Sequence, residues 1–282
     1  MRKECKAFGY SSKAGGGLIL IFVSLFSLAM LNGCGTLPNG RGWGQDATFT
    51  PGWNRVGKAA VKAALSYETW VPLAGALALQ IDDLDERLSD WATDETPVFG
   101  NREDADRWSS YLRDASAAAY LATALATPSG DEPGEWAASK AKGLAVGLAA
   151  WGATAGSTTV LKKTTGRTRP NGEDDRSLPS GHASTAGSFT TLARRNVNSL
   201  SWSSWGKTSA NVGLLGLAAG TAWARVESEE HYPSDVLVGY ALGHFFSSFI
   251  QDAFLGLDMK SGPFFSVEPS RNGVMVGLHW AF

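Results

Sequence analysis

Apolar residues recur at helical spacing from about Val56 onward, in segments separated by short polar stretches. No run of alternating apolar and polar residues, which would indicate a half-buried strand, occurs before residue 260. The polar stretches contain Pro, Gly, Ser and Asp, which commonly end helices. The pattern predicts an all-α core of six helices, at 57–81, 102–127, 136–162, 182–197, 206–224 and 235–256.

The C-terminal segment has a different pattern. Apolar residues alternate with others along 274–282, and the dipeptide Asn272-Gly273, a common hairpin turn, precedes them. Residues 264–267 supply a second short extended segment. We therefore expect a β-hairpin within 259–282 that packs on the helical domain.

The N-terminal segment has the pattern of a secretory signal: basic residues, then an apolar run at 18–31. Residues 31–34, Leu-Asn-Gly-Cys, resemble the bacterial lipobox, in which cleavage before the cysteine leaves it acylated. Cys34 is thus the predicted lipidation site, and Gly35 after it favours the outer membrane by resemblance to enterobacterial sorting. The alternative is an ordinary signal peptide or anchor helix with an incidental cysteine. Cys5, the other cysteine, leaves with the signal, so no disulfide is expected.

The composition shift along the chain predicts four parts. These are a signal peptide at 1–33, a tether rich in Gly, Pro, Asn and Thr at 34–55, a helical domain at 56–258 and the hairpin at 259–282. Removal of 1–33 takes away four basic residues and one acidic residue, which leaves a net charge near −5. Such a charge argues against a nucleic-acid binder that relies on a basic surface.

The helices are too weakly apolar to predict a membrane-spanning bundle. Among their charge-free runs only 143–161 approaches the roughly 20 apolar residues of a membrane span, and it consists mostly of Gly, Ala, Thr and Ser. We expect a soluble bundle held at the envelope by its lipid, with its domain facing the periplasm. A protein that dips into the bilayer interface is the alternative.

Three polar blocks lie between the apolar segments of the second half of the chain. They consist of Lys162 with Arg169 and Pro170, of Pro179, Ser180, Gly181 and His182, and of Arg225 with His231 and Asp235. They occupy about a quarter of the chain, from Lys162 to Asp235. Together they supply three permanent cations, a Ser-Gly turn, two histidines and a carboxylate.

These residue types suit phosphoryl transfer, which needs positive charge around the phosphate oxygens, a nucleophile and a proton donor. Arginine binds phosphate oxygens with two N–H groups, and a helix N-terminus favours an anion. His231 beside Asp235 fits a nucleophile and the carboxylate that orients it, which leaves His182 to protonate the leaving oxygen. Covalent catalysis through phosphohistidine needs no metal, and no cofactor or metal ligand set is predicted.

The three blocks resemble the signature of the type 2 phosphatidic acid phosphatase superfamily, which includes bacterial class A acid phosphatases and vanadium haloperoxidases. That signature is Lys-x6-Arg-Pro, Pro-Ser-Gly-His and Ser-Arg-x5-His-x3-Asp, and ten positions match in order and spacing. The resemblance implies the superfamily's six-helix core and a phosphatase with His231 as nucleophile, Asp235 as its partner and His182 as acid. It also implies a phosphate cage formed by Lys162, Arg169, Ser180, Gly181 and Arg225.

Two features depart from the signature. Ala224 stands where the signature has Ser, which removes one hydroxyl donor. Glu227, Glu229 and Glu230 lie between Arg225 and His231, where lipid-handling members tend to be apolar. We expect these acids to form a solvated loop, because charge runs usually face water. The alternative is that they face the pocket mouth, where they would repel anions or bind a cation.

The sequence therefore predicts a lipid-anchored phosphatase that hydrolyses phosphomonoesters or pyrophosphates, with a membrane lipid as the plausible substrate. Two alternatives stay open at this point. One is a vanadate-dependent haloperoxidase, because the same cage would bind vanadate. The other is a non-catalytic envelope scaffold that keeps the fold. No nucleic-acid partner is expected, and the oligomeric state is not predicted.

Overall fold

The computed structural model describes residues 35–37, 39–256, 264–270 and 273–279. The predicted signal peptide and Cys34 lie outside the described residues. The helices, in chain order, are α2 (Trp53–Ala64), α3 (Tyr67–Ala78), α4 (Leu84–Glu95), α5 (Arg102–Ala126), α6 (Pro133–Thr165), α7 (Gly181–Ser199), α8 (Ser204–Glu227) and α9 (Pro233–Ile250). A 3-10 turn, Ile81–Asp83, precedes α4, and a π-helical turn, Gln251–Leu255, continues α9.

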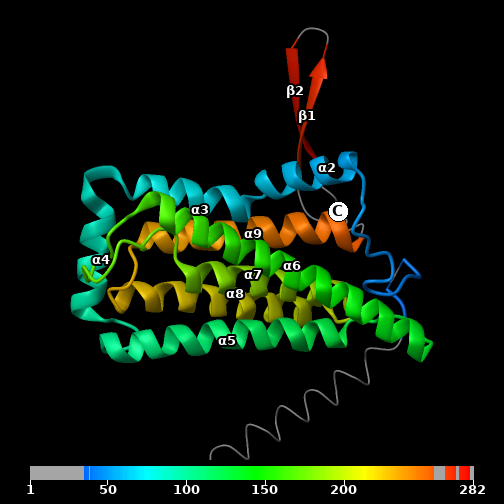
Figure 1. Ribbon diagram of the computed structural model, residues 1–282, viewed down its shortest axis with the longest axis horizontal. Coiled ribbons are helices and arrows are strands. Elements are labelled where there is room, and N and C mark those ends of the chain that lie inside the picture. Colours follow the sequence, from blue (N-terminus) through cyan, green and yellow to red (C-terminus); the bar gives the residue numbers. More distant parts are fainter. Residues whose placement is uncertain (1–34, 38, 257–263, 271–272, 280–282) are drawn as a thin grey trace, which may run out of the picture.

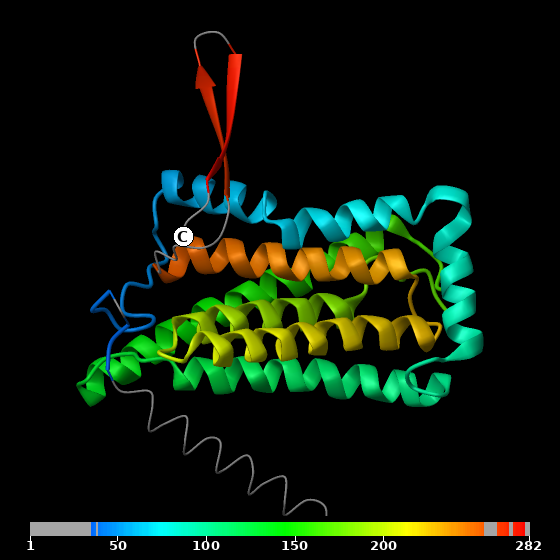
Figure 2. The same cartoon turned by 180° about the vertical axis from the view of Figure 1, so that it is seen from behind.

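The helices form a bundle in which α7 and α9 are central. Helix α7 packs against α5, α6, α8 and α9, and α3 covers the outer side of α9 (Figures 1 and 2). Helix α4 runs across one end of the bundle and connects α3 to α5 (Figure 1). This arrangement confirms the predicted all-α core.

Close contact between α7 and α9 depends on two glycines of α9. A Cβ built on Gly243 would lie 2.3 Å from the Ser184 carbonyl oxygen, and one on Gly239 would lie 2.7 Å from the Ser180 carbonyl oxygen. Only glycine leaves room for backbones at this distance. The start of α7 is thereby held beside the start of α9. This contact brings the Ser-Gly turn of the second polar block next to the third block.

Two helix predictions were wrong at the N-terminal side of the bundle. The segment 57–81 forms two helices, α2 and α3, because Ser66 takes an extended conformation as the N-cap of α3. The segment 82–97 was predicted as a break between helices, but it contains α4, whose inward face buries Asp85, Ser89, Ala92 and Thr93. The other five predicted helices are present with small shifts of their ends.

Part of the predicted tether is packed against the bundle. Trp43 is fully buried, and its backbone N–H donates to the Pro128 carbonyl at 2.7 Å. The Lys140 ammonium lies 5.2 Å from the centre of a Trp43 ring, while Nζ donates to backbone carbonyls at the end of α5 and just after it. Residues around Trp43 therefore belong to the core of the helical domain and do not act as a free tether.

The C-terminal hairpin consists of β1 (Phe264–Ser270) and β2 (Gly273–His279), paired antiparallel with Val267 opposite Val276. This confirms the predicted hairpin. Both views show the hairpin projecting away from the helices near α2 (Figures 1 and 2). The prediction that it packs on the helical domain was therefore wrong.

Among the described helices, α6 is long and apolar enough to cross a membrane, by length and composition alone. Large apolar side chains are also exposed along α3 and the turn after it, including Trp70, Leu77 and Ile81. Leu77 is 74% exposed and Ile81 61% exposed.

Candidate active site

The three polar blocks converge at the end of the bundle that α4 crosses. Lys162 lies in the last turn of α6, His182 in the first turn of α7 and Arg225 in the last turn of α8. His231 precedes α9, and Asp235 lies in its first turn. The backbone N–H of Ser180 donates to the Asp235 carbonyl at 3.0 Å, which joins the second block to the third.

His231 is buried beside Asp235. The ring is 2% exposed, and its Nδ1 lies 3.7 Å from Asp235 Oδ2. This is longer than a hydrogen bond, and within the described residues no other group is close enough to bond Nδ1. Burial lowers the pKa of His231 to about 4, although the neighbouring carboxylate acts in the opposite direction. The imidazole is therefore neutral at pH 7, with Nδ1 toward Asp235 and Nε2 on the other side of the ring.

Asp235 is held rigidly. It is fully buried; Oδ1 accepts a hydrogen bond from Arg167 at 2.8 Å, and Oδ2 accepts from the Ser177 hydroxyl at 2.5 Å and from the Tyr232 backbone N–H at 3.0 Å. The bond to Tyr232 caps α9, because Asp235 is its third residue and Pro233 its first. Burial raises the pKa of Asp235, but the neighbouring His231, the Ser177 hydroxyl and the Arg167 charge outweigh this effect and lower it, so the carboxylate stays ionised.

The predicted cage cations lie together around this pair. The Lys162 ammonium donates to the Arg176 carbonyl, and burial with the nearby Arg169 charge lowers the pKa of Lys162 to about 8. Arg225 is 5% exposed, and burial lowers its pKa to about 10, which keeps it charged at pH 7. Arg169 donates from Nε to Asp174 at 2.7 Å.

The Ser-Gly turn opens α7 as predicted. Ser180 is fully buried and is the N-cap, with its hydroxyl oxygen accepting from the Ala183 backbone N–H at 3.4 Å. A Cβ built on Gly181 would lie 3.9 Å from Lys162 Cε, so the first N–H groups of α7 and the Lys162 side chain are neighbours. The positive end of α7 thus adds to the charge of the cage.

His182 contacts two residues of α5. Its Nε2 lies 3.0 Å from an Arg113 guanidinium nitrogen and 3.3 Å from the Ser110 hydroxyl. Since a guanidinium can only donate, Nε2 accepts and the proton of the neutral ring is on Nδ1. Burial, followed by the charges of Arg225 and Arg113, lowers the pKa of His182 to about 3.

The site residues fall within a family match. The model of the PAP2 superfamily matches residues 141–254, which include every predicted catalytic and cage residue. This match to the PAP2 superfamily supports phosphatase activity.

No curated protein matches the chain. Among solved structures, the first transmembrane PAP2 type phosphatidylglycerolphosphate phosphatase from Bacillus subtilis is similar, with a TM-score of 0.49 and 21% sequence identity. The match covers 66% of this chain and 95% of that one.

The prediction that the three glutamates between Arg225 and His231 form a solvated loop was wrong. Glu227 is fully buried and accepts the backbone N–H groups of Val98 and Phe99, each at 2.9 Å. Glu229 forms an ion pair with Arg102. Glu230 forms ion pairs with Arg169 and Arg225 inside the cage. Each acid has at least one partner that is distant in the sequence: Val98 and Phe99 for Glu227, Arg102 for Glu229 and Arg169 for Glu230.

Three residues outside the PAP2 signature also belong to the site. Arg167 bonds both Asp235 and Asp85 at 2.8 Å, and its guanidinium carbon lies 4.0 Å from the centre of the Tyr232 ring. Asp85 of α4 is buried and accepts the Ser234 backbone N–H at 2.8 Å. Arg113 adds a cation on the α5 side.

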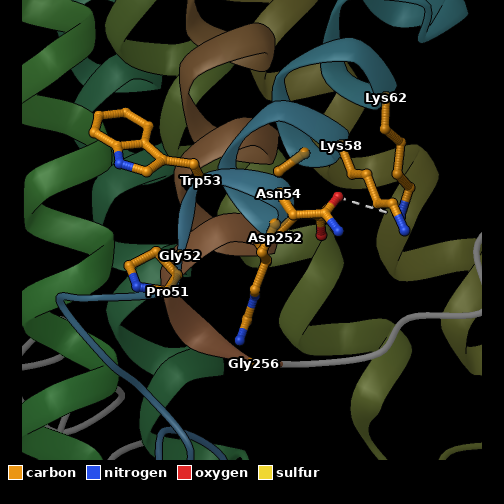
Figure 3. A pocket seen from close by; sticks show the side chains of 10 residues that line it. Pro51, Gly52, Trp53, Asn54, Lys58, Lys62, Asp252 and Gly256 are labelled. Atoms are coloured by element: carbon orange, nitrogen blue, oxygen red, sulfur yellow. Dashed lines mark hydrogen bonds and ion pairs between the residues drawn. The ribbon is translucent and has the colours of Figure 1, made fainter.

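Within the described residues, no group of three or more His, Cys, Asp or Glu side chains is placed to hold a metal ion. A cavity of about 590 Å³ lies at the opposite end of α9 from the site, lined by Trp53, Arg55, Lys58, Lys62 and Asp252 among others (Figure 3). The Asp252 carboxylate forms an ion pair with Lys62 at 3.1 Å, and its backbone carbonyl accepts a hydrogen bond from Arg55. This cavity is separate from the candidate active site.

Proposed function

We propose that this PAP2 protein is a metal-independent phosphatase that hydrolyses phosphomonoesters or pyrophosphates through a phosphohistidine on His231. The observation that carries the proposal is the position of a buried, neutral imidazole between a carboxylate and a group of cations. Asp235 lies on its Nδ1 side at 3.7 Å. Burial lowers the pKa of this imidazole, and the charges of Lys162 and Arg225 also lower it.

In the first step, Nε2 of His231 attacks phosphorus and the bond to the leaving oxygen breaks. Lys162, Arg169 and Arg225 neutralise the phosphoryl oxygens, and Asp235 stabilises the positive charge that develops on the ring. The negative charge of the bound phosphate offsets Arg225 and Arg113, which raises the proton affinity of His182. His182 takes up a proton from solvent as the substrate binds, and it then delivers that proton to the leaving oxygen and becomes neutral again.

In the second step, water attacks the phosphorus of phosphohistidine. His182 accepts a proton from that water, the bond from phosphorus to Nε2 breaks, and inorganic phosphate forms. The imidazole of His231 returns to its neutral form, and Asp235 keeps Nδ1 protonated throughout. Each proton is carried by a named side chain, so the cycle needs no metal-bound water.

A membrane lipid phosphate is the proposed natural substrate. The exposed apolar side chains of α3 and the turn after it, such as Leu77 and Ile81, offer a face that suits the edge of a bilayer. The sequence of 31–34 supports acylation of Cys34, which would hold the domain at the outer membrane. Both features would place the site within reach of lipid headgroups.

The test is phosphate release by the full-length chain in detergent, from p-nitrophenyl phosphate and from dispersed phosphatidic acid, with and without EDTA. We expect release from both substrates at rates that EDTA leaves unchanged, with phosphatidic acid giving the higher kcat/KM. Loss of activity in EDTA that added divalent metal restores would contradict the metal-independent mechanism. Activity on the soluble ester alone would contradict the lipid assignment.

A further inference from the structure

One carboxylate oxygen lies at the point where two arginines of the cage converge. Glu230 Oε2 accepts a hydrogen bond from Arg225 at 2.7 Å, and the same oxygen forms an ion pair with Arg169. Two guanidinium groups that meet at one anionic oxygen are the arrangement that a cage needs for a phosphate oxygen. Glu230 Oε2 therefore lies where a phosphate oxygen would bind.

The other carboxylates near these arginines bind from the rim. Asp106 of α5 pairs with Arg225 and Asp174 pairs with Arg169, and each contacts a single arginine. Their side chains are 55% and 43% exposed, whereas that of Glu230 is 20% exposed. Asp106 and Asp174 can stay in place when an anion enters, but the Glu230 carboxylate and a phosphate oxygen cannot share one position.

The backbone at Glu230 is fixed, and its side chain can move. The backbone N–H groups of Glu230 and His231 both donate to the Arg225 carbonyl, at 3.2 and 3.1 Å. Rotation about the side-chain bonds of Glu230 would carry its partly exposed carboxylate into water without moving the nucleophile. Water would then solvate the released charge, which limits the cost of displacement.

We propose that Glu230 is an internal anion that holds the phosphate position of the cage and is displaced when phosphate binds. It thereby sets the affinity of the site for phosphate groups and returns to expel the phosphate product. This rests on the proposed phosphatase function and assigns a role in affinity and release to a residue outside the PAP2 signature.

The test is isothermal titration of inorganic phosphate into the full-length chain, comparing wild type with Glu230→Gln. Glutamine keeps the shape of the side chain but removes the charge that competes for two arginines. Because charge-assisted hydrogen bonds are strong, we expect Kd for phosphate to fall by about tenfold. Phosphate should also become a stronger inhibitor of hydrolysis, with a lower kcat because the product leaves more slowly.

Glu229→Gln is the matched control. It removes the same charge one residue away, where the carboxylate pairs with Arg102 outside the cage. Its Kd for phosphate should equal that of wild type. Tighter binding by Glu230→Gln alone would then come from removal of the competing carboxylate and not from the change in net charge. Glu230→Ala, checked for folding by circular dichroism, should bind phosphate more tightly as well, and it replaces the glutamine variant if that one does not fold.

Equal or weaker phosphate binding by both Glu230 variants would overturn the inference and show that Glu230 only keeps the arginines in position. If wild type hydrolyses phosphoesters in the same preparation, that result leaves the phosphatase function intact. Absence of hydrolysis by wild type, with tighter phosphate binding by Glu230→Gln, would overturn the proposed function and keep the displaced anion. Absence of phosphate binding by any variant would overturn the inference.

Discussion

Replacing His231 with alanine is expected to lower phosphate release by at least about a thousandfold, since no covalent intermediate can form without the nucleophile. The remaining cations would still bind phosphate, so phosphate affinity should change far less than kcat. The measurement is kcat and KM for p-nitrophenyl phosphate together with the Kd for inorganic phosphate. A variant that kept more than a small fraction of the wild-type kcat would show that another group attacks phosphorus.

His244→Ala is the matched control for this substitution. His244 lies on α9 and is buried like His231, but it contacts Ser66 at 3.0 Å and Thr191 at 3.2 Å, away from the cage. Its removal creates a cavity of the same kind and should lower stability while kcat of the folded protein stays close to wild type. An equal loss of kcat in both variants would point to a folding defect and not to a missing nucleophile.

Replacing Arg167 with alanine is expected to destabilise the protein by about 3–5 kcal/mol, the usual cost of breaking a buried ion pair. The substitution leaves Asp85 and Asp235 buried without their shared cation; these residues are 3% and 0% exposed. For a domain of this size the melting temperature should fall by roughly 10 °C or more. Thermal unfolding followed by circular dichroism measures the change.

Arg107→Ala serves as the comparison for Arg167→Ala. Arg107 pairs with Asp104 on the surface of α5, with side chains that are 58% and 43% exposed. Exposed pairs of this kind contribute at most about 1 kcal/mol. If Arg167→Ala shifted the melting temperature no more than Arg107→Ala, the network around Asp235 would not depend on Arg167.

Local sequence signals were sufficient for most of the bundle. The Ser-Gly turn at Ser180 was predicted to open a helix and does so, while α6 and α9 begin at Pro133 and Pro233, two or three residues before their predicted starts. The break between α2 and α3 was not predictable in this way, because Ser66 is compatible with a continuous helix and only its extended backbone ends α2.

Helix α4 shows where charge misled the prediction. Its acids suggested a loop, yet its buried residues recur at helical spacing, and only one of them is apolar: Asp85, Ser89, Ala92 and Thr93. Asp85 is buried because Arg167 and Ser234, far away in the sequence, provide its hydrogen bonds. No local pattern reports such partners, so neither Asp85 nor Arg167 could be assigned from the sequence.

The spacing of the motifs predicted that their own side chains lie together. The additional residues that contact them depend on the fold. His231 and Asp235 lie together because the chain enters α9 between them. Glu230 was expected to face water, but the carbonyl of Arg225 binds its backbone and turns its carboxylate toward two arginines. Arg113 is contributed by α5, which carries none of the three blocks.

The covalent intermediate is the central claim, and trapping it is the most direct test. Wild-type protein mixed with a phosphomonoester in EDTA and quenched in alkali, which preserves phosphohistidine, would be digested and analysed by mass spectrometry. The mechanism predicts a phosphoryl group on His231 that appears during turnover and is missing from His231→Ala. Turnover at the full rate with no phosphoryl group on His231, or with one on a different residue, would contradict it.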